Sequence, residues 1–487
     1  MRNEPVSPQS PTGDVPAAKG RAMIRLLVIG GSDAGISAAL RAREKDTSAE
    51  VSVLLTDEYP NYSICGLPFY LSGETPDHRQ LAHRTAFEGI EILTNHRAVA
   101  VHPVAKTVEV VRGPNGSMRR LRYDHLVMAT GAVPSCPKGL LGLNLPGVYF
   151  LHTMADGFAV QNHLTERGAR SVIIVGAGYI GVEMADALRH RGIEVTLVSH
   201  TDPVFPTVDP GFGKLIGEEL ARHGVCIVGG CTVERIEADS SHSLAVSGTG
   251  GFAGSADLVL VATGVRPDTD LATAAGIPLG PSGAIRVTQR METGIPGIWA
   301  AGDCAETWHR ILQRPAYLPL GTTAHKQGRV AGENAVGGER LFGGSVGTQT
   351  VKVFELAIAR TGLREPEARV AGFDPITVET QTWDHKAYYP DAQKLRIRVT
   401  GDRRTDRLLG AQILGHWQSG VSKRIDIFAT ALFHGMGVED LNDLDLSYTP
   451  PFSSPWDPVQ AAAMAWMEAA KRTWPEVRGP TLDREKA

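Results

Sequence analysis

Two stretches of sequence decide the fold of this chain. Residues 24–35 read IRLLVIGGSDAG, and residues 171–181 read SVIIVGAGYIG. Each joins an apolar run typical of a buried strand to a Gly-rich turn, which a helix pattern and a second apolar run follow. Such a turn lets the backbone approach a pyrophosphate whose negative charge lies at the helix N-terminus. Because the pattern occurs twice, the sequence predicts two nucleotide-binding units in one chain.

The segments around both turns support this interpretation. Residues 36–43 and a segment ending at Leu188 have helix patterns, and residues 51–55 and 194–198 have strand patterns. The second turn carries all three glycines of the G-x-G-x-x-G pattern, whereas the first has Ser32 at the middle position. The predicted phosphate-binding residues are Gly30, Gly31, Ser32 and Gly35 in the first turn and Gly176, Gly178 and Gly181 in the second.

The composition is that of a globular protein and argues against some functions. The 487 residues are 42% hydrophobic and 21% charged, with a formal net charge of −4. This balance gives no support for nucleic-acid binding, and no apolar run is long enough to predict a membrane-spanning helix. Five widely spread cysteines suit a reducing cytoplasm better than a secreted disulfide-stapled fold. We interpret the only close pair, Cys226 and Cys231, as buried thiols on a strand and predict no metal site.

The start of the chain and its last third differ from the rest in composition and residue pattern. Residues 1–22 are polar and rich in Pro and Ser, so they predict a disordered extension rather than a signal peptide. Stretches at 394–399 and 408–414 alternate as antiparallel strands do, and residues 423–435 have a helix pattern. A Pro-rich loop then precedes a last helix near 459–471. These features predict a separate C-terminal α+β domain.

Several short segments carry a resemblance to a known family. Residues 126–131 read LVMATG, residues 297–303 read GIWAAGD, residues 61–70 read NYSICGLPFY, and residues 446–454 read LSYTPPFSS. Together with the two Gly-rich units and the run Tyr388-Tyr389-Pro390, they make residues 24–468 resemble the single-cysteine FAD-dependent pyridine nucleotide-disulfide oxidoreductases. The similarity is to the coenzyme A-disulfide reductase, NADH oxidase and NADH peroxidase branch.

This resemblance implies an α/β fold with two Rossmann-like dinucleotide-binding domains, one for FAD and one for NAD(P), and a C-terminal α+β dimerisation domain. It also implies a homodimer. The expected bounds are a disordered extension over 1–22, an FAD-binding domain over 23–150 and 268–344, an NAD(P)-binding domain over 151–267, a dimerisation domain over 345–470 and a loose tail over 471–487.

The resemblance assigns the redox chemistry to Cys65. Two-cysteine relatives carry a second thiol five residues further on, where this chain has Tyr70, so the disulfide partner of Cys65 must come from something else. We expect a flanking helix N-terminus to lower the pKa of the thiol. Tyr448 and one of Tyr388 and Tyr389 resemble tyrosines that approach the cysteine from the partner subunit and can protonate a leaving thiolate. Aromatic packing at a dimer seam is the alternative for these tyrosines.

The resemblance also assigns cofactor-binding residues. Thr130 and Gly131 match the second flavin-binding segment, and Asp303 matches the aspartate that contacts the ribityl and phosphate region of FAD. Glu183 resembles the acid near the nicotinamide, and Tyr179 resembles a gate that swings aside for it. Packing of the helix against the sheet is an equally good interpretation of Tyr179 and Glu183.

Three departures from the family pattern bear on the acceptor. Asp33 occupies the position of the histidine that oxidases and peroxidases place near the cysteine, which counts against peroxide and, less strongly, against oxygen. The reductases have a small residue there. Ile64 replaces an asparagine and Trp456 replaces a lysine, and both changes weaken the case for a phosphate-rich ligand such as coenzyme A. A less charged disulfide or persulfide becomes plausible.

Two further departures concern the nucleotides. The acidic residue expected for the ribose of FAD falls on Leu55, with Asp57 or Glu58 as substitutes. In the second unit the corresponding position is Ser199, followed by His200. Because no acid repels a 2′-phosphate there, we expect NADPH to be accepted and slightly preferred to NADH.

The leading hypothesis is therefore a cytoplasmic, homodimeric, FAD-dependent NAD(P)H:disulfide or persulfide reductase with a small-molecule substrate and no nucleic-acid or membrane partner. An NAD(P)H oxidase that reduces oxygen is the second hypothesis. A flavin-bearing redox sensor with little turnover is the third, because Leu55, Asp33 and Ile64 can indicate lost catalysis.

Overall fold

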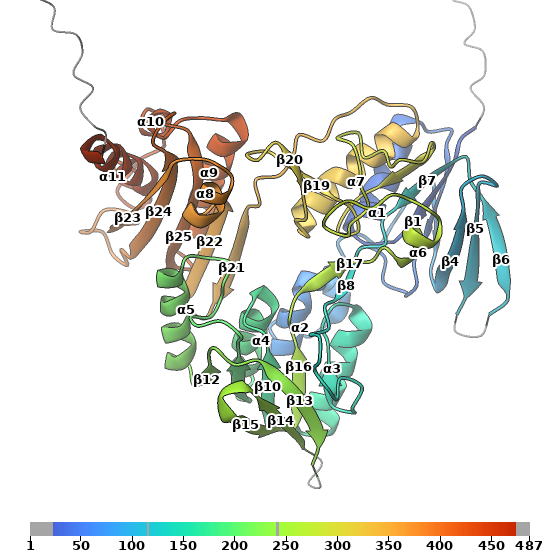
Figure 1. Cartoon of the computed structure of the whole chain (residues 1–487), viewed down its shortest axis with the longest axis horizontal. Coiled ribbons are helices and arrows are strands. Elements are labelled where there is room, and N and C mark those ends of the chain that lie inside the picture. The colour runs from blue at the N-terminus through green and yellow to red at the C-terminus, as the bar shows by residue number, and fades with distance from the viewer. Residues whose placement is uncertain (1–22, 114–115, 240–242, 474–487) are drawn as a thin grey trace, which may run out of the picture.

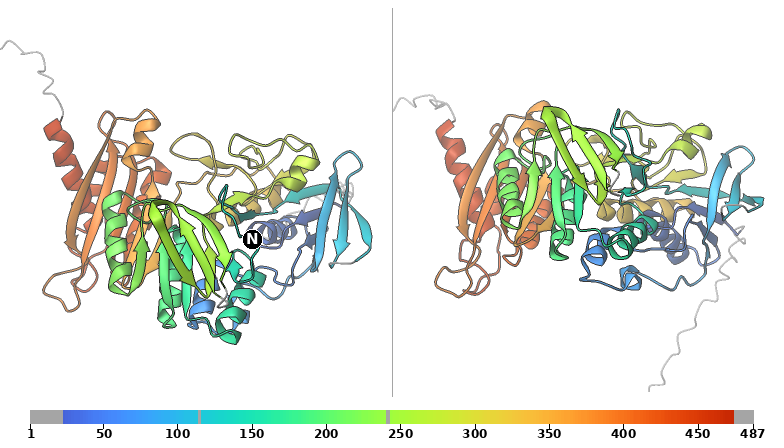
Figure 2. Two further views of the ribbon diagram at one scale, coloured as in Figure 1. Left: turned by 60° about the horizontal axis from the view of Figure 1, so that its bottom comes forward. Right: turned by 90° about the horizontal axis from the view of Figure 1, so that it is seen from below.

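The computed structural model describes residues 23–113, 116–239 and 243–473. Each of its three domains is built on a five-stranded sheet, which confirms the predicted α/β fold with two Rossmann-like domains and a C-terminal α+β domain. The C-terminal domain lies at one end of the molecule and the first domain at the other (Figures 1 and 2). The predicted extension over 1–22 and residues 474–487 of the predicted tail lie outside the described residues.

The first domain is built on a parallel sheet of order β18-β7-β1-β2-β3. Helices α1 and α7 lie side by side against it (Figure 1). Gly328 of α7 permits this close approach, since a Cβ there would lie 2.1 Å from the backbone oxygen of Ala34. A three-stranded antiparallel sheet joins the domain beyond β3. The elements are β1 Arg25–Ile29, α1 Asp33–Lys45, β2 Glu50–Leu54, β3 Ile90–Leu93, β4 His96–His102, β5 Thr107–Arg112, β6 Met118–Arg122, β7 His125–Met128, α6 Asp270–Ala274, β18 Ile298–Ala300, β19 Thr307–His309, β20 Arg314–Ala316 and α7 Gly321–Ala335.

The second domain repeats the plan with a parallel sheet of order β12-β11-β10-β16-β9. An antiparallel meander, β13 to β15, packs beside it, and the short pair β8 and β17 links the two domains. The elements are β8 Ala132–Pro134, β9 Val148–Tyr149, α3 Met154–Glu166, β10 Ser171–Val175, α4 Tyr179–His190, β11 Glu194–Val198, α5 Pro210–Arg222, β12 Val225–Val228, β13 Val233–Ala238, β14 Leu244–Gly248, η3 Thr249–Gly251, β15 Phe252–Ala256, β16 Leu258–Val261 and β17 Val265–Pro267.

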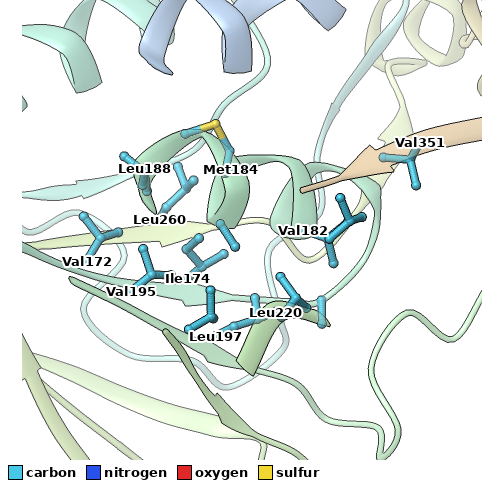
Figure 3. Packing of buried hydrophobic residues seen from close by; sticks show 14 of the residues in the cluster. Val172, Ile174, Val182, Met184, Leu188, Val195, Leu197, Leu220, Leu260 and Val351 are labelled. Atoms are coloured by element: carbon cyan, nitrogen blue, oxygen red, sulfur yellow. The ribbon is translucent and has the colours of Figure 1, made fainter. Parts of the chain in front are cut away.

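The C-terminal domain is an antiparallel sheet of order β21-β22-β25-β24-β23 with helices packed on it. Its strand β21 reaches the second domain, where Val351 joins the cluster of Val182 and Ile174 around α4 (Figure 3). This shared core fixes the C-terminal domain against α4. The elements are β21 Gln349–Val353, β22 Leu356–Gly362, α8 Glu365–Val370, β23 Pro375–Trp383, β24 Lys394–Asp402, β25 Leu408–His416, α9 Val421–His434, α10 Val438–Asn442 and α11 Pro458–Thr473.

The structure differs from the sequence prediction at three places. Strand β9 pairs with β16 of the second sheet although it precedes residue 151, the predicted start of that domain. Helix α11 continues to Thr473, beyond the predicted start of the loose tail at 471. Cys226 is exposed on β12 and only Cys231 is buried, after the strand, so the prediction of two buried strand thiols was wrong. In the described part of the chain, no helix is long and apolar enough to cross a membrane.

Candidate active site

One cleft of about 2730 Å³ collects most of the predicted residues, and segments of all three domains line it. Gly35 and Gly181 do not line it. The predicted residues that line it are Gly30, Gly31, Ser32, Thr130, Gly131 and Asp303 from the first unit, Gly176, Gly178, Tyr179, Glu183 and Ser199 from the second, and Cys65.

The first Gly-rich turn has the form that a pyrophosphate requires. Gly30 has a φ of +116°, and a Cβ there would lie 1.9 Å from the backbone oxygen of Ala129. A Cβ on Gly35 would lie 1.8 Å from the backbone oxygen of Gly30, so helix α1 can approach the strand only without a side chain there. Ser32 stands before α1, exposed and without a capping hydrogen bond. Its hydroxyl and the helix N-terminus therefore face the cleft as donors to a phosphate.

The second turn repeats this packing. Gly176 has a φ of +111°, and a Cβ on Gly181 would lie 1.9 Å from the backbone oxygen of Gly176. Gly178 differs, because a Cβ there would meet no atom within 4 Å. Nothing in the protein itself demands a glycine at this position. A nucleotide phosphate approaching the N-terminus of α4 does.

Two similar turns close the cleft between the domains. The Oγ1 of Thr130 donates a hydrogen bond of 2.6 Å to the backbone oxygen of Asp268, and the Oγ1 of Thr263 donates one of 2.6 Å to that of Ser135. Gly131 has a φ of +76° with open space on its Cβ side. Each Thr-Gly turn is thus tied to the chain that crosses to the other domain, which holds the two nucleotide-binding units in register.

Asp303 follows β18 in a turn that a buried glutamine holds. The Oε1 of Gln327 accepts a 2.9 Å hydrogen bond from the backbone nitrogen of Gly302, while its Nε2 donates to Glu306 and Thr307. Burial, with a smaller effect from Asp33, raises the pKa of Asp303 to about 6. Its carboxyl group has no hydrogen-bond partner among the described residues, so it fits the hydroxyl donors of a ribityl chain.

Cys65 lies in the short 3-10 helix η1 Ile64–Gly66, directly before α2 Leu67–Ser72. Helix α2 lies against α3 and α4 of the second domain, where Leu67 and Leu71 are fully buried (Figure 1). The backbone nitrogen of Ser63 donates a 2.8 Å hydrogen bond to the backbone oxygen of Leu81. The thiol is therefore fixed between the two nucleotide-binding units, exposed to the cleft.

The expected lowering of the thiol's pKa was wrong. Desolvation raises the pKa of Cys65, and the negative charges of Glu183, Asp33 and Asp303 raise it further. Helix α2 has only six residues, and its weak N-terminal field is outweighed by burial and by these three carboxyl groups.

Tyr70, at the position where two-cysteine relatives carry the second thiol, is part of an aromatic cluster. Its ring packs edge-on against Phe158 of α3 and against His78 of η2 His78–Leu81, with centroid distances of 6.0 and 6.3 Å. All five cysteines are free. A disulfide to Cys65 must therefore be formed with another molecule.

Tyr179, the first residue of α4, and Glu183, in its second turn, both face the cleft. Burial, helped by Asp186, raises the pKa of Glu183 to about 7. Tyr179 packs edge-on against Phe205 with a centroid distance of 4.8 Å, and burial raises its pKa. Both residues thus pack and face the cleft, so the two interpretations from the sequence are compatible.

Glu183→Gln is expected to stabilise the protein at pH 8 and to change its stability little at pH 4.5. Below the ordinary pKa of 4.5 the carboxyl is protonated in the folded and unfolded states, so burial costs nothing. As the pH rises towards 7, the Glu183 carboxyl ionises first in the unfolded state. The free energy of unfolding of the wild-type protein therefore falls by about 3 kcal/mol. Thermal unfolding of both FAD-loaded proteins across this pH range measures the difference. An equal gain at both pH values would contradict it.

The three predicted tyrosines lie away from the cleft of their own chain. Tyr388, Tyr389 and Tyr448 are 74%, 43% and 45% exposed. Lys386 joins their two segments, since its backbone nitrogen donates 3.3 Å to Pro450 and its Nζ lies 5.9 Å from the centroid of the Tyr448 ring. The tyrosines therefore form one exposed surface on the C-terminal domain.

The structure separates the alternatives at the two ribose positions. Leu55 is buried beneath Gly31, and Asp57 lines the cleft, whereas the Oε1 of Glu58 accepts a 2.8 Å hydrogen bond from Asn95. Asp57 is thus the better placed substitute for the missing acid.

At the second ribose position, Ser199 is 1% exposed and its Oγ contacts Thr201. The adjacent His200 is exposed and lines the cleft. Of these two cleft residues after β11, only His200 has an exposed side chain.

The comparisons with known proteins agree with this site. Residues 24–328 match the family model "Pyridine nucleotide-disulphide oxidoreductase", and residues 348–458 match that family's dimerisation domain. The chain is 33% identical over 442 residues to the NAD(P)H coenzyme A polysulfide/persulfide reductase of Pyrococcus horikoshii, covering 89% of this chain and 96% of that protein.

Solved structures are equally similar. A NAD-dependent persulfide reductase from A. fulgidus superposes with a TM-score of 0.88 at 36% identity, over 92% of this chain and 84% of that one. Reduced CoADR-RHD from Bacillus anthracis gives a TM-score of 0.89 at 30% identity, over 93% and 81%.

Proposed function

Because this chain belongs to the pyridine nucleotide-disulphide oxidoreductase family, we propose that Cys65 is its single redox centre and that a small disulfide or persulfide is its electron acceptor. The chain is an FAD-dependent NAD(P)H oxidoreductase that acts on a sulfur group. The carrying observation is a lone thiol, exposed in the cleft that both Gly-rich turns line, with no second cysteine to pair with.

The residues of the chain perform the binding and proton steps. Ser32 and the turn at Gly30 hold the FAD pyrophosphate, Asp303 accepts hydrogen bonds from the ribityl hydroxyls, and the turn at Gly178 holds NAD(P)H. FAD held there would supply two-electron hydride chemistry between NAD(P)H and sulfur. The Cys65 thiolate attacks the acceptor's S–S bond, forms a mixed disulfide and releases one thiolate; two-electron reduction of that mixed disulfide would restore the Cys65 thiolate and release the second thiolate.

The proton donor for the leaving thiolate comes from the second subunit of a homodimer. The matched dimerisation domain supports the dimer. Tyr448 and one of Tyr388 and Tyr389 are exposed on that domain and absent from the cleft of their own chain, which suits delivery to the partner's Cys65. The proposed domain bounds follow the predicted ones, with the NAD(P) domain beginning at Val148 because β9 belongs to its sheet.

The acceptor bears little charge near its sulfur. The relative from Pyrococcus horikoshii is named for coenzyme A persulfide, and this chain has the apolar Ile64 beside Cys65. Trp456 is 63% exposed where the resemblance places a lysine. NADPH is accepted as reductant, since the exposed His200 offers a donor and no acid at the end of β11 opposes a 2′-phosphate.

An anaerobic acceptor panel tests this function. The enzyme is reduced with NADPH, and in parallel with NADH, and then mixed separately with coenzyme A disulfide, glutathione disulfide, an organic persulfide and oxygen. We expect a persulfide or a weakly charged disulfide to reoxidise the flavin fastest, and NADPH to reduce it at least as efficiently as NADH. Fastest reoxidation by oxygen would instead identify an oxidase, and slow reoxidation by all four would identify a sensor.

A further inference from the structure

Cys65 faces three carboxyl groups that come from distant parts of the chain. Asp33 is the first residue of α1, Glu183 lies in the second turn of α4, and Asp303 follows β18. All three line the same cleft as the thiol. They meet because each one follows the carboxyl end of a parallel strand, and the two sheets present these ends to one crevice.

These carboxyl groups are unpaired. None of the three has a hydrogen-bond or ion-pair partner within the part of the chain that the structure describes. Other carboxyl groups of limited exposure are paired, as Glu333 is with Arg41 and Glu367 is with Arg360. No cation is among the charged groups that act most strongly on the Cys65 thiol. The field at the thiol is therefore negative.

Of these three residues, only Asp33 has no proposed role in binding FAD or NAD(P)H. Asp303 suits the ribityl hydroxyls, and Glu183 lies beside the nicotinamide position, whereas Asp33 faces Gly321 at the N-terminus of α7, with its Oδ2 3.2 Å from where a Cβ would stand. It lines the same cleft as Cys65, and its negative charge raises the pKa of that thiol. Its charge is available to act on whatever approaches Cys65.

We infer that Asp33 makes Cys65 selective for charge, so that the acceptor's sulfur is flanked by neutral or cationic groups and an anionic group beside it is rejected. This rests on the proposed function, because it concerns the acceptor of the same thiol. A negative group within a few ångströms of Asp33 is repelled in a partly desolvated cleft, where charges interact far more strongly than in water. The same repulsion expels the thiolate that leaves when the mixed disulfide forms.

Thiol reagents of graded charge test the field without requiring turnover. Three methanethiosulfonates, carrying an ethylsulfonate, an ethyl and an ethyltrimethylammonium group, each form a mixed disulfide with Cys65 and release methanesulfinate. The rate of each reagent with the FAD-loaded enzyme is divided by the rate of the same reagent with 2-mercaptoethanol, which corrects for differences in intrinsic reactivity. Cys65→Ser supplies the background from the exposed Cys136 and Cys226. We expect the cationic reagent to exceed the anionic one roughly tenfold after this correction.

Three variants assign the effect. Asp33→Asn should reduce the cation-to-anion ratio severalfold, and Asp33→Glu should retain it. Asp270→Asn removes the same charge from the wall of the same cleft, away from the groups that act on Cys65, and should leave the ratio unchanged. Equal corrected rates for the three reagents, or a ratio that Asp33→Asn does not alter, would overturn the inference.

A second measurement separates this inference from the proposed function. Steady-state reduction of cystamine, bis(2-hydroxyethyl) disulfide and 3,3′-dithiodipropionate should follow the same charge order as the reagents. Charge-selective labelling of Cys65 with no turnover of any disulfide or persulfide would sink the proposed function while upholding the field at Cys65. Turnover that favours the anionic disulfide would overturn the charge selectivity and uphold the function.

Discussion

Replacing Cys65 by serine is expected to lower disulfide-dependent NADPH oxidation by at least about a thousandfold, because a hydroxyl cannot exchange with a disulfide at neutral pH. The variant should still fold and hold FAD. Cys65 lies in η1 at the cleft, and among the described residues its thiol makes no hydrogen bond to the turn at Gly30 or to the turn at Asp303. Reduction of the bound flavin by NADPH should therefore persist, while its reoxidation by the acceptor should fail.

Anaerobic stopped-flow absorbance separates these two half-reactions. Cys136→Ser is the matched control, because Cys136 is also an exposed free thiol but does not line the cleft. It should retain wild-type turnover. If Cys65→Ser kept more than about a tenth of the disulfide turnover, the single-thiol mechanism would be refuted. If it lost its flavin, the comparison would be repeated with Cys65→Ala, which removes the polar group altogether.

Much of the fold could be predicted from the sequence because its signals are local. Residues 194–198 were predicted as a strand and form β11, and the predicted strand and Gly-rich turn in residues 171–181 form β10 and the start of α4. Buried parallel strands appear in the sequence as unbroken apolar runs, so the residues at which they begin and end are well defined. Strand β9 was missed because two residues, Val148 and Tyr149, leave no periodic pattern; only their pairing with β16 defines them.

The electrostatics of the site could not be predicted in the same way. Asp33, Glu183 and Asp303 are far apart in the sequence, and the resemblance related only Asp33, through the histidine position, to the cysteine. Only the folded chain brings them to one thiol, and so the expected sign of the pKa shift at Cys65 was wrong. A helix N-terminus beside Cys65 was expected from the sequence, whereas the carboxyl groups that oppose it come from α1, from α4 and from the turn after β18. A pKa is a property of tertiary neighbours.

Gly178→Val and Gly181→Val, two changes within one motif, are expected to have opposite consequences. A Cβ on Gly181 would lie 1.9 Å from the backbone oxygen of Gly176, so a valine there must displace α4 from β10 and destabilise the second domain. A Cβ on Gly178 meets nothing within 4 Å, and the residue's φ of −84° and ψ of −164° lie in the extended region that valine prefers. Gly178→Val should therefore fold with its flavin bound.

The Gly178→Val protein should bind NADPH more weakly. Its side chain occupies the space in which a pyrophosphate approaches the N-terminus of α4, so one or two charge-assisted hydrogen bonds are lost, and the Kd for NADPH should rise roughly 10- to 100-fold. Titration of NADPH or a redox-inactive analogue, together with thermal unfolding and flavin absorbance, measures all three properties. Unchanged NADPH affinity in a well-folded Gly178→Val protein would mean that the second Gly-rich turn does not hold the nucleotide. Because the first turn carries Ser32 where the second carries Gly178, this result also tells which of the two turns tolerates a side chain beside its phosphate.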